Sequence, residues 1–145
     1  MTLIELTLSV AIVAILAVVA LDSYKGYKER ARNAQAVNDI AGMSLTISGY
    51  IVSNRTPPAS LAQVGYGGKL DPWGRAYFYV DLTTTQGHGA SRKDKRLNPL
   101  NSDFDLYSAG KDGRTQTSLM SPTSRDDIIR ARDGRFIGLA SDFDP

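Results

Sequence analysis

The side chains best suited to chemistry are aspartates in the last third of the sequence. A glycine-containing segment, residues 106–113, holds Asp112, and the adjacent pair Asp126 and Asp127 follows after thirteen intervening residues. Calcium takes roughly six to eight oxygen ligands, commonly carboxylates and backbone carbonyls on a flexible loop. The segment and the pair could supply such oxygens, because the glycines permit a tight backbone path. By spacing alone, solvated turn residues are the simpler interpretation, and a calcium loop is the alternative.

The sequence offers few residues for catalysis. Its single histidine, His88, lies between two glycines, and cysteine is absent. This leaves few routes to a Ser-His-Asp triad or a catalytic zinc site, and no phosphate-binding glycine motif occurs. Asp126 and Asp127 could in principle do acid–base work, but adjacent loop residues do not define a cleft and metal ligation explains them better. We therefore expect that the protein is not an enzyme.

The balance of charge argues against nucleic acid as a partner. Lys and Arg total 17 against 15 Asp and Glu, and the resulting net charge of +2 is too small for a phosphate-binding surface. The basic run Arg92–Arg96 is typical of a solvated loop, and a docking patch is the sharper alternative. Since cysteine is absent, no disulfide can stabilise the fold.

Glu5 is the only charged residue among the first 21. A carboxylate in apolar surroundings is costly unless it is paired, and such a group in a membrane segment is a functional candidate. No lysine or arginine precedes Lys25, so the nearest cation is an α-amino group at residue 1. An identical helix packed alongside with an axial shift would bring one chain's Glu5 to the next chain's amino terminus. The alternative is a first-turn acid at the lipid interface, favoured by the helix dipole.

An apolar helix must position Glu5. From Leu6 to Leu21 every side chain is apolar except Thr7 and Ser9. As a helix, residues 1–21 extend about 30 Å, which is enough to cross a bilayer. We expect this segment to be a membrane anchor or the core of a filament. A signal peptide is the other interpretation, and the lack of a basic stretch before the run argues against it.

Residues 22–54 predict an amphipathic continuation of the same helix, ending near Ser53 before Pro57 and Pro58. One stripe steps by three or four residues: Tyr24, Tyr27, Ala31, Ala34, Val37, Ala41, Leu45 and Ser48. A second group widens it where a sheet could pack: Ile40, Met43, Ile47, Tyr50 and Ile51. Asp22 and Gly26 weaken the helix less than one interior proline would, so we expect an unbroken helix through residues 19–27.

Residues 55–145 predict a globular head. The turn Asp71–Gly74 precedes an aromatic strand over 76–80, and further strands are expected over 104–107 and 135–139. Three short strands at this spacing form a small antiparallel sheet that covers the helix. The expected fold class is α+β, with one long N-terminal helix packed on the sheet and long loops.

The first residues carry a resemblance to a known family. Met1–Leu6 followed by an apolar helix looks like the mature N-terminus of type IV pilins and type II secretion pseudopilins, and Thr2–Glu5 match it residue by residue. Met1 stands where the family usually has Phe, and Asp22 where many members have Pro. The turn Asp71–Gly74 is similar to that of the major pseudopilin. The resemblance implies a pilin fold, cleavage by prepilin peptidase, and an N-methylated amino terminus on Met1 that assembles together with Glu5.

The resemblance also implies a calcium site. In major pseudopilins a strand-end Leu and Ser give carbonyls and later aspartates give carboxylates. Carried over by position, the ligands would be Leu106, Ser108, Asp112, Asp126 and Asp127. The thirteen residues between Asp112 and Asp126 are a departure from the family's shorter spacing.

The leading hypothesis is therefore a structural subunit that polymerises into a type IV pilus-like helical filament, either a type II secretion pseudopilus or a surface pilus. It implies a single pass through the bacterial inner membrane before assembly and a periplasmic or extracellular filament afterwards. The implied partners are further copies, minor pilins or pseudopilins, the inner-membrane assembly platform and prepilin peptidase. The alternative is a monomeric, membrane-anchored binding module with a periplasmic or extracellular head.

Overall fold

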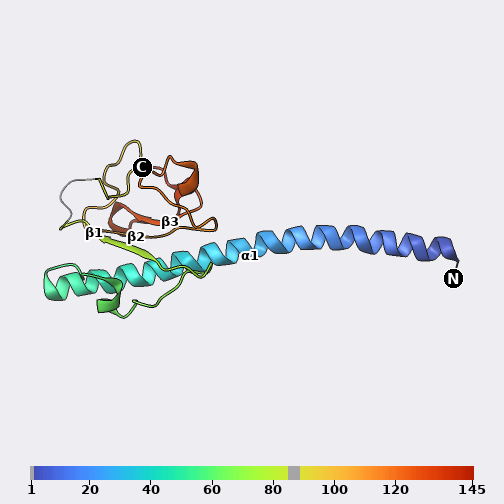
Figure 1. Ribbon diagram of the computed structural model, residues 1–145, viewed down its shortest axis with the longest axis horizontal. Coiled ribbons are helices and arrows are strands. Elements are labelled where there is room, and N and C mark those ends of the chain that lie inside the picture. Colours follow the sequence, from blue (N-terminus) through green and yellow to red (C-terminus); the bar gives the residue numbers. More distant parts are fainter. Residues whose placement is uncertain (1, 85–88) are drawn as a thin grey trace. The chain divides into compact units, whose positions relative to one another are not determined.

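The computed structural model describes residues 2–84 and 89–145, and its first element is the helix α1, Leu3–Asn54 (Figure 1). Residues 19–27 are helical throughout in this single chain, as the absence of a proline at position 22 predicts. The helix ends in a left-handed residue, Arg55, with φ 60°, whose N–H donates to the carbonyl of Ile51 at 2.7 Å. The prolines that follow cannot continue it. Met1 and His88 lie outside the described residues.

The chain divides into two compact units, Met1–Arg32 and Asn33–Pro145. The first unit consists of the N-terminal part of α1. The second unit contains the rest of α1 together with everything that follows it. The amphipathic half of the helix therefore belongs largely to the same unit as the head.

One face of α1 is buried in the second unit, and it is not the longer stripe expected from the sequence. The buried residues are Ala36, Ile40, Met43, Ser44 and Ile47. Leu45 is 76% exposed, and Tyr24 and Tyr27 are also exposed. The expected stripe was wrong at Leu45, because the sheet covers the neighbouring face of the helix, which carries the bulkier Ile and Met side chains.

The head contains a four-stranded antiparallel sheet in the order β1-β2-β3-β4, so the protein has an α+β fold. The strands are β1 (Phe78–Asp81), β2 (Phe104–Ser108), β3 (Ile128–Ala131) and β4 (Phe136–Leu139). Within the described residues, short 3₁₀ helices occupy Leu61–Val64, Pro122–Ser124, Arg132–Gly134 and Ala140–Asp142. Strand β3 was missed from the sequence, where the acids before it were assigned to a loop. Its pairing with β4 aligns Ile128 with Leu139.

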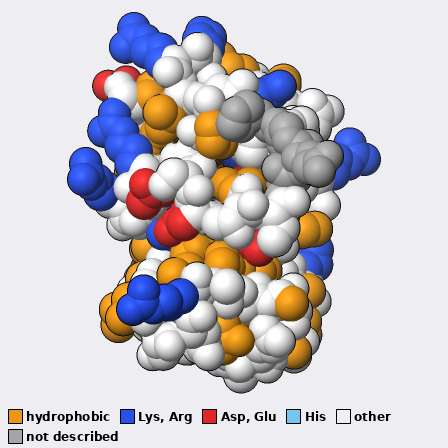
Figure 2. Space-filling model, turned by 90° about the vertical axis from the view of Figure 1, so that its left-hand side faces the viewer, with side chains coloured by type: hydrophobic (Ala, Val, Ile, Leu, Met, Phe, Trp, Pro, Cys, Tyr) orange, Lys and Arg blue, Asp and Glu red, His pale blue; other side chains and the backbone are white. Residues whose placement is uncertain are grey.

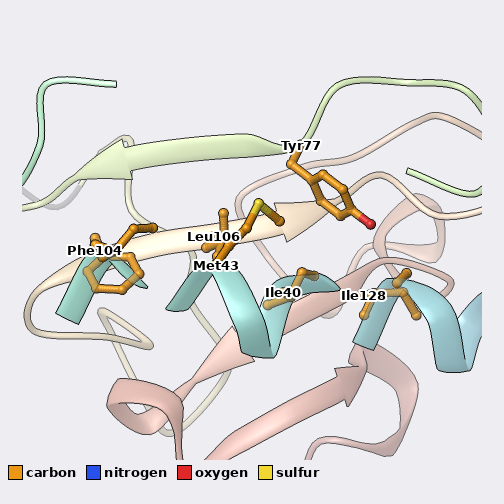
Figure 3. Packing of buried hydrophobic residues seen from close by; sticks show 8 residues of the cluster. Ile40, Met43, Tyr77, Phe104, Leu106 and Ile128 are labelled. Atoms are coloured by element: carbon orange, nitrogen blue, oxygen red, sulfur yellow. The ribbon is translucent and has the colours of Figure 1, made fainter. Parts of the chain in front are cut away.

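The alternation of side chains along the strands separates two cores. Phe104, Leu106 and Ile128 point toward α1 and pack against Ile40 and Met43 (Figure 3). On the opposite face, a second cluster is covered by the long loops and consists of Leu100, Leu119, Ile129, Ala131 and Ala140. Adjacent residues of β3 thus serve different cores, as the two-residue period of a strand requires.

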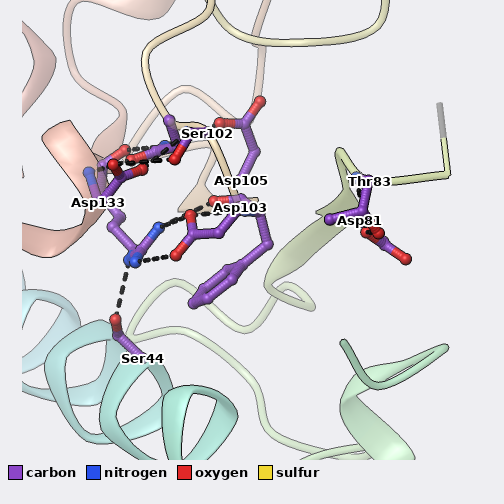
Figure 4. Close-up of polar contacts among 10 residues, drawn as sticks. Ser44, Asp81, Thr83, Ser102, Asp103, Asp105 and Asp133 are labelled. Carbon is purple, nitrogen blue, oxygen red and sulfur yellow. Dashed lines mark hydrogen bonds and ion pairs between the residues drawn. The ribbon is translucent and has the colours of Figure 1, made fainter. Parts of the chain in front are cut away.

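A buried arginine links the sheet to α1. The guanidinium of Arg130 donates to the hydroxyl of Ser44 on α1 at 2.9 Å and to both carboxylate oxygens of Asp103 at 2.7 and 2.8 Å (Figure 4). It also donates to the carbonyl of Phe104 at 3.0 Å and lies 3.9 Å from the centroid of that ring. Burial alone would raise the pKa of Asp103, but the hydrogen bonds from Arg130 and from the backbone N–H of Phe104, together with the positive charge of Arg130, outweigh it and lower the pKa.

The buried face of α1 predicts a sharp contrast between two positions. Replacing Ile40 with Ala should lower the free energy of unfolding by about 2–5 kcal/mol, because it leaves a cavity between helix and sheet. Leu45→Ala, on the exposed face of the same helix, should change it by less than about 0.5 kcal/mol. Chemical denaturation of both variants measures the difference. Equal effects would contradict the assigned face.

The ion pair at Arg130 predicts a pH dependence. Asp103→Asn should destabilise the protein by about 1–3 kcal/mol at pH 7, since it removes a charged acceptor from a buried guanidinium. Because the folded-state pKa of Asp103 is lowered, its contribution is present above the ordinary aspartate pKa and is lost as the pH falls through the folded value. The gap between wild type and variant should therefore close at acidic pH. Asp144→Asn, at an exposed site, is the control. If wild type and Asp103→Asn still differ in stability at acidic pH, the assigned ion pair with Arg130 is contradicted.

Candidate assembly segment and candidate cation loop

The start of α1 is closed by a reciprocal pair of hydrogen bonds between Thr2 and Glu5. The backbone N–H of Thr2 donates to Oε2 of Glu5 at 2.7 Å, and the N–H of Glu5 donates to Oγ1 of Thr2 at 3.3 Å. The Thr2 carbonyl accepts the first helical hydrogen bond, from Leu6 at 3.2 Å. This is a capping box, which satisfies two donors that a helix start otherwise leaves unpaired. The spacing Thr-x-x-Glu was visible in the sequence, but the box was not predicted.

The apolar run that follows is uncovered in the chain. Its large side chains from Leu3 to Leu21 are between 47% and 83% exposed. The most apolar 18-residue window has a mean hydropathy of 2.7, and none of it is buried. By length and composition, α1 is compatible with a single-pass membrane anchor.

The predicted calcium ligands lie at the end of β2 and in the loop beyond it. Leu106 is fully buried, and its side chain packs in the core that faces α1. Ser108 is buried too, and its hydroxyl donates to Oδ2 of Asp71 at 2.6 Å and accepts from the N–H of Gly110 at 3.2 Å. Leu106 is the middle residue of β2 and Ser108 its last, and the Ser108 side chain is hydrogen-bonded to Asp71.

Asp71 organises the turn that approaches this loop. Its Oδ1 accepts from the N–H groups of Trp73 at 3.0 Å and of Arg75 at 2.8 Å, while Oδ2 accepts from Ser108. The turn thereby places Arg75 beside the loop, where its guanidinium donates to the carbonyls of Gly110 and Lys111. These contacts were not predicted, although the aspartate at the first position of the Asp-Pro-Trp-Gly turn is a known turn signal.

The carboxylate of Asp126 contacts the backbone of Asp112. The N–H of Asp112 donates to Oδ2 of Asp126 at 2.8 Å, and Oδ1 of Asp112 accepts from the N–H of Arg114 at 2.7 Å. Asp112 is exposed and Asp126 is partly buried. Gly110 has a φ of +61°, and a Cβ there would lie 2.0 Å from the carbonyl oxygen of Asp126. A side chain at position 110 therefore has no room.

The third carboxylate, Asp127, is fully buried and paired with an arginine. Its Oδ2 accepts from Nη2 of Arg92 at 2.5 Å and from the hydroxyl of Thr115 at 2.6 Å. Burial raises the pKa of Asp127 to about 6, against the opposing effects of Arg92 and Thr115. Nη1 of Arg92 donates to Thr115 at 2.7 Å, and the guanidinium lies 4.1 Å from the centroid of the Tyr107 ring.

The ligand set implied by resemblance does not converge on one point. In the part of the chain that the structure describes, no group of three or more His, Asp or Glu side chains is close enough to hold a metal ion. The carbonyls of Gly110 and Lys111 accept from Arg75, and Asp127 is held by Arg92. These residues as arranged do not fit a calcium ion. Calcium binding, which the resemblance implies, stays an untested prediction.

The sequence suggested that the basic run at residues 92–96 is a solvated loop. The structure shows that the run is not uniformly solvated. Arg92 is only 2% exposed, and its backbone N–H donates to Oδ2 of the buried Asp105 at 2.7 Å. Lys95 and Arg96 are exposed. On the face drawn in Figure 2, basic side chains are spread around the outline among polar and apolar ones. The expectation of a solvated loop was wrong for Arg92, since its backbone N–H donates to an acid of β2 and its guanidinium pairs with an acid from the segment before β3.

The position of Asp71 generates a stability prediction. Asp71→Ala should cost about 2–4 kcal/mol, because two backbone N–H groups and the Ser108 hydroxyl lose their acceptor in a buried site. Asp112→Ala, at an exposed position with one backbone donor, should cost less than about 1 kcal/mol. Urea denaturation of the two variants measures both values. Indistinguishable variants would show that Asp71 does not organise the turn.

Comparison with known proteins adds no relative. No protein-family model, curated protein or solved structure matches the chain. The resemblance to pilins and pseudopilins therefore stands on the residues that carry it, namely Thr2–Glu5, the apolar run and the turn at Asp71–Gly74.

Proposed function

We propose that the chain is a structural, non-catalytic subunit that polymerises through α1 into a type IV pilus-like helical filament, as the pseudopilus of a type II secretion system or as a surface pilus. The observation that carries the proposal is the uncovered apolar run from Leu3 to Leu21. Each fully buried Leu, Ile or Val side chain gains about 1.5–3 kcal/mol, so covering this run is strongly favourable. Identical helices from other copies, bundled at a filament core, provide such a cover.

Before assembly the same run crosses the bacterial inner membrane once, with the head on the periplasmic side. The lipid tails and the helices of other copies are alternative apolar surroundings for it. Moving between them leaves the run covered and changes mainly the surroundings of Glu5, the one ionised side chain it contains. The implied partners are other copies, minor pilins or pseudopilins, the assembly platform and prepilin peptidase.

Glu5 has two separable roles in this proposal. Within one chain it caps α1 through Thr2. In the filament its negative charge pairs with the N-methylated amino terminus on Met1 of a neighbouring copy, which sets the axial register. Glutamine serves as well as glutamate at this position of a capping box, but it carries no charge. The two roles can therefore be tested separately.

The yield of filaments from cells distinguishes the capping role of Glu5 from its charge-pairing role. Glu5→Gln should keep the helix cap yet reduce sheared filaments more than tenfold, because losing one partner of a buried charge pair costs roughly 2 kcal/mol or more. Thr2→Ala removes the capping hydroxyl and keeps the charge, so its filaments should be near wild-type in number. Electron microscopy of sheared material and immunoblots of membranes measure assembly and insertion.

The controls separate assembly from expression. All variants should reach the membrane in wild-type amounts. Abundant, wild-type-like filaments of Glu5→Gln would refute the charge pairing. If the wild type itself stays in the membrane and never forms filaments, the membrane-anchored binding module is the better description.

A further inference from the structure

We propose that the loop system between β2 and β3 is held by two internal arginines, Arg75 and Arg92, in the role that a calcium ion would otherwise fill. The head then reaches its native structure without added metal. This inference concerns the head alone and does not depend on filament assembly.

Arg75 donates hydrogen bonds to backbone carbonyl oxygens of the loop. Its Nη2 donates to the carbonyls of Gly110 and Lys111, which lie in the loop directly after β2. The backbone follows the guanidinium closely, since a Cβ on Gly113 would lie 2.7 Å from Nη1 of Arg75. Gly113 has a φ of +71°, which favours glycine. The loop is thus shaped around a cation that the chain itself supplies.

Arg92 forms an ion pair with the buried carboxylate of Asp127. It joins Asp127 through Nη2 at 2.5 Å and reaches Thr115 through Nη1 at 2.7 Å, while Thr115 also donates to Asp127 at 2.6 Å. This closed triangle connects three segments that are far apart in the sequence. The pair is almost entirely sealed from water, with side-chain exposures of 2% for Arg92 and 0% for Asp127.

A calcium ion held by Oδ2 of Asp127 and by the carbonyls of Gly110 and Lys111 would have to displace both arginines. A hard cation needs roughly six to eight oxygens, and the oxygens already described accept from guanidinium, hydroxyl or backbone N–H groups. Among the described residues, Oδ1 of Asp127 is a buried oxygen without a hydrogen-bond partner. A divalent ion placed among them would also lie beside two positive charges, which repel it. Removing Arg92 from Asp127 would leave a buried charge without its partner. The two guanidinium groups therefore oppose the entry of a metal ion at these oxygens.

The first experiment uses the full chain in detergent micelles and calcium chloride as the probe. Melting temperatures in millimolar calcium and in EGTA should agree within about 1 °C, since a ligand that does not bind the native state cannot stabilise it. Titration calorimetry with calcium should give no saturable heat. A rise of several degrees together with one bound calcium per chain would overturn the proposal.

Variants test the arginines directly. Arg92→Gln should lower the melting temperature by roughly 10 °C, because it leaves the Asp127 carboxylate buried and unpaired. Arg75→Gln should lower it by roughly 5 °C through loss of the two carbonyl contacts. Lys95→Gln and Arg114→Gln remove the same charge from exposed neighbouring positions and should shift it by less than about 2 °C.

The outcome does not require that every variant folds. If Arg92→Gln cannot be purified, the calorimetry on wild type and the comparison of Arg75→Gln with Arg114→Gln still decide the question. Arginine variants whose melting temperatures equal those of the control variants would refute the proposal. So would an Arg75→Gln protein that is no less stable than wild type in EGTA.

Discussion

A guanidinium that is shut off from water must find acceptors inside the protein, because an unpaired buried charge costs several kcal/mol. Arg130 finds them on two sides, at Ser44 of α1 and at Asp103 and Phe104 where β2 begins. Satisfying this one charge therefore fixes where the sheet lies on the second half of α1. The apolar core around Ile40, Met43 and Leu106 forms in the same layer and excludes the water that would weaken the ion pair.

The same constraint recurs on the other face of the sheet. Arg92 and Asp127 are 35 residues apart in the sequence, and Asp105 and Asn101 complete the buried polar layer through hydrogen bonds of 2.7 to 2.8 Å. Small domains of this size have limited apolar area to bury, and this one has no cysteine for a disulfide. Its long loops are organised by charge-assisted hydrogen bonds, which are stronger and more directional than neutral ones.

Periodicity made part of this structure predictable. The helix, its end near residue 54 and the strands β1, β2 and β4 follow from apolar spacing, turn residues and prolines. The strand β3 did not, because Asp126 and Asp127 precede it and its Ile128 and Ile129 serve two different cores. The partners of the acidic side chains could not be predicted from the sequence for a similar reason. Local spacing suggested a shared ligand for Asp112, Asp126 and Asp127, whereas an arginine from a distant loop meets only Asp127.

The two outer strands of the sheet, β1 and β4, have only four residues each. An exposed strand edge is a template on which a second chain can form backbone hydrogen bonds, and short edges offer little length for such pairing. If α1 gathers many copies, their heads are brought to a high local concentration, where unwanted β-sheet growth between them would become most favourable. The brevity of these edges then works as protection against aggregation, and it leaves side-by-side helix packing as the route by which copies of the chain associate.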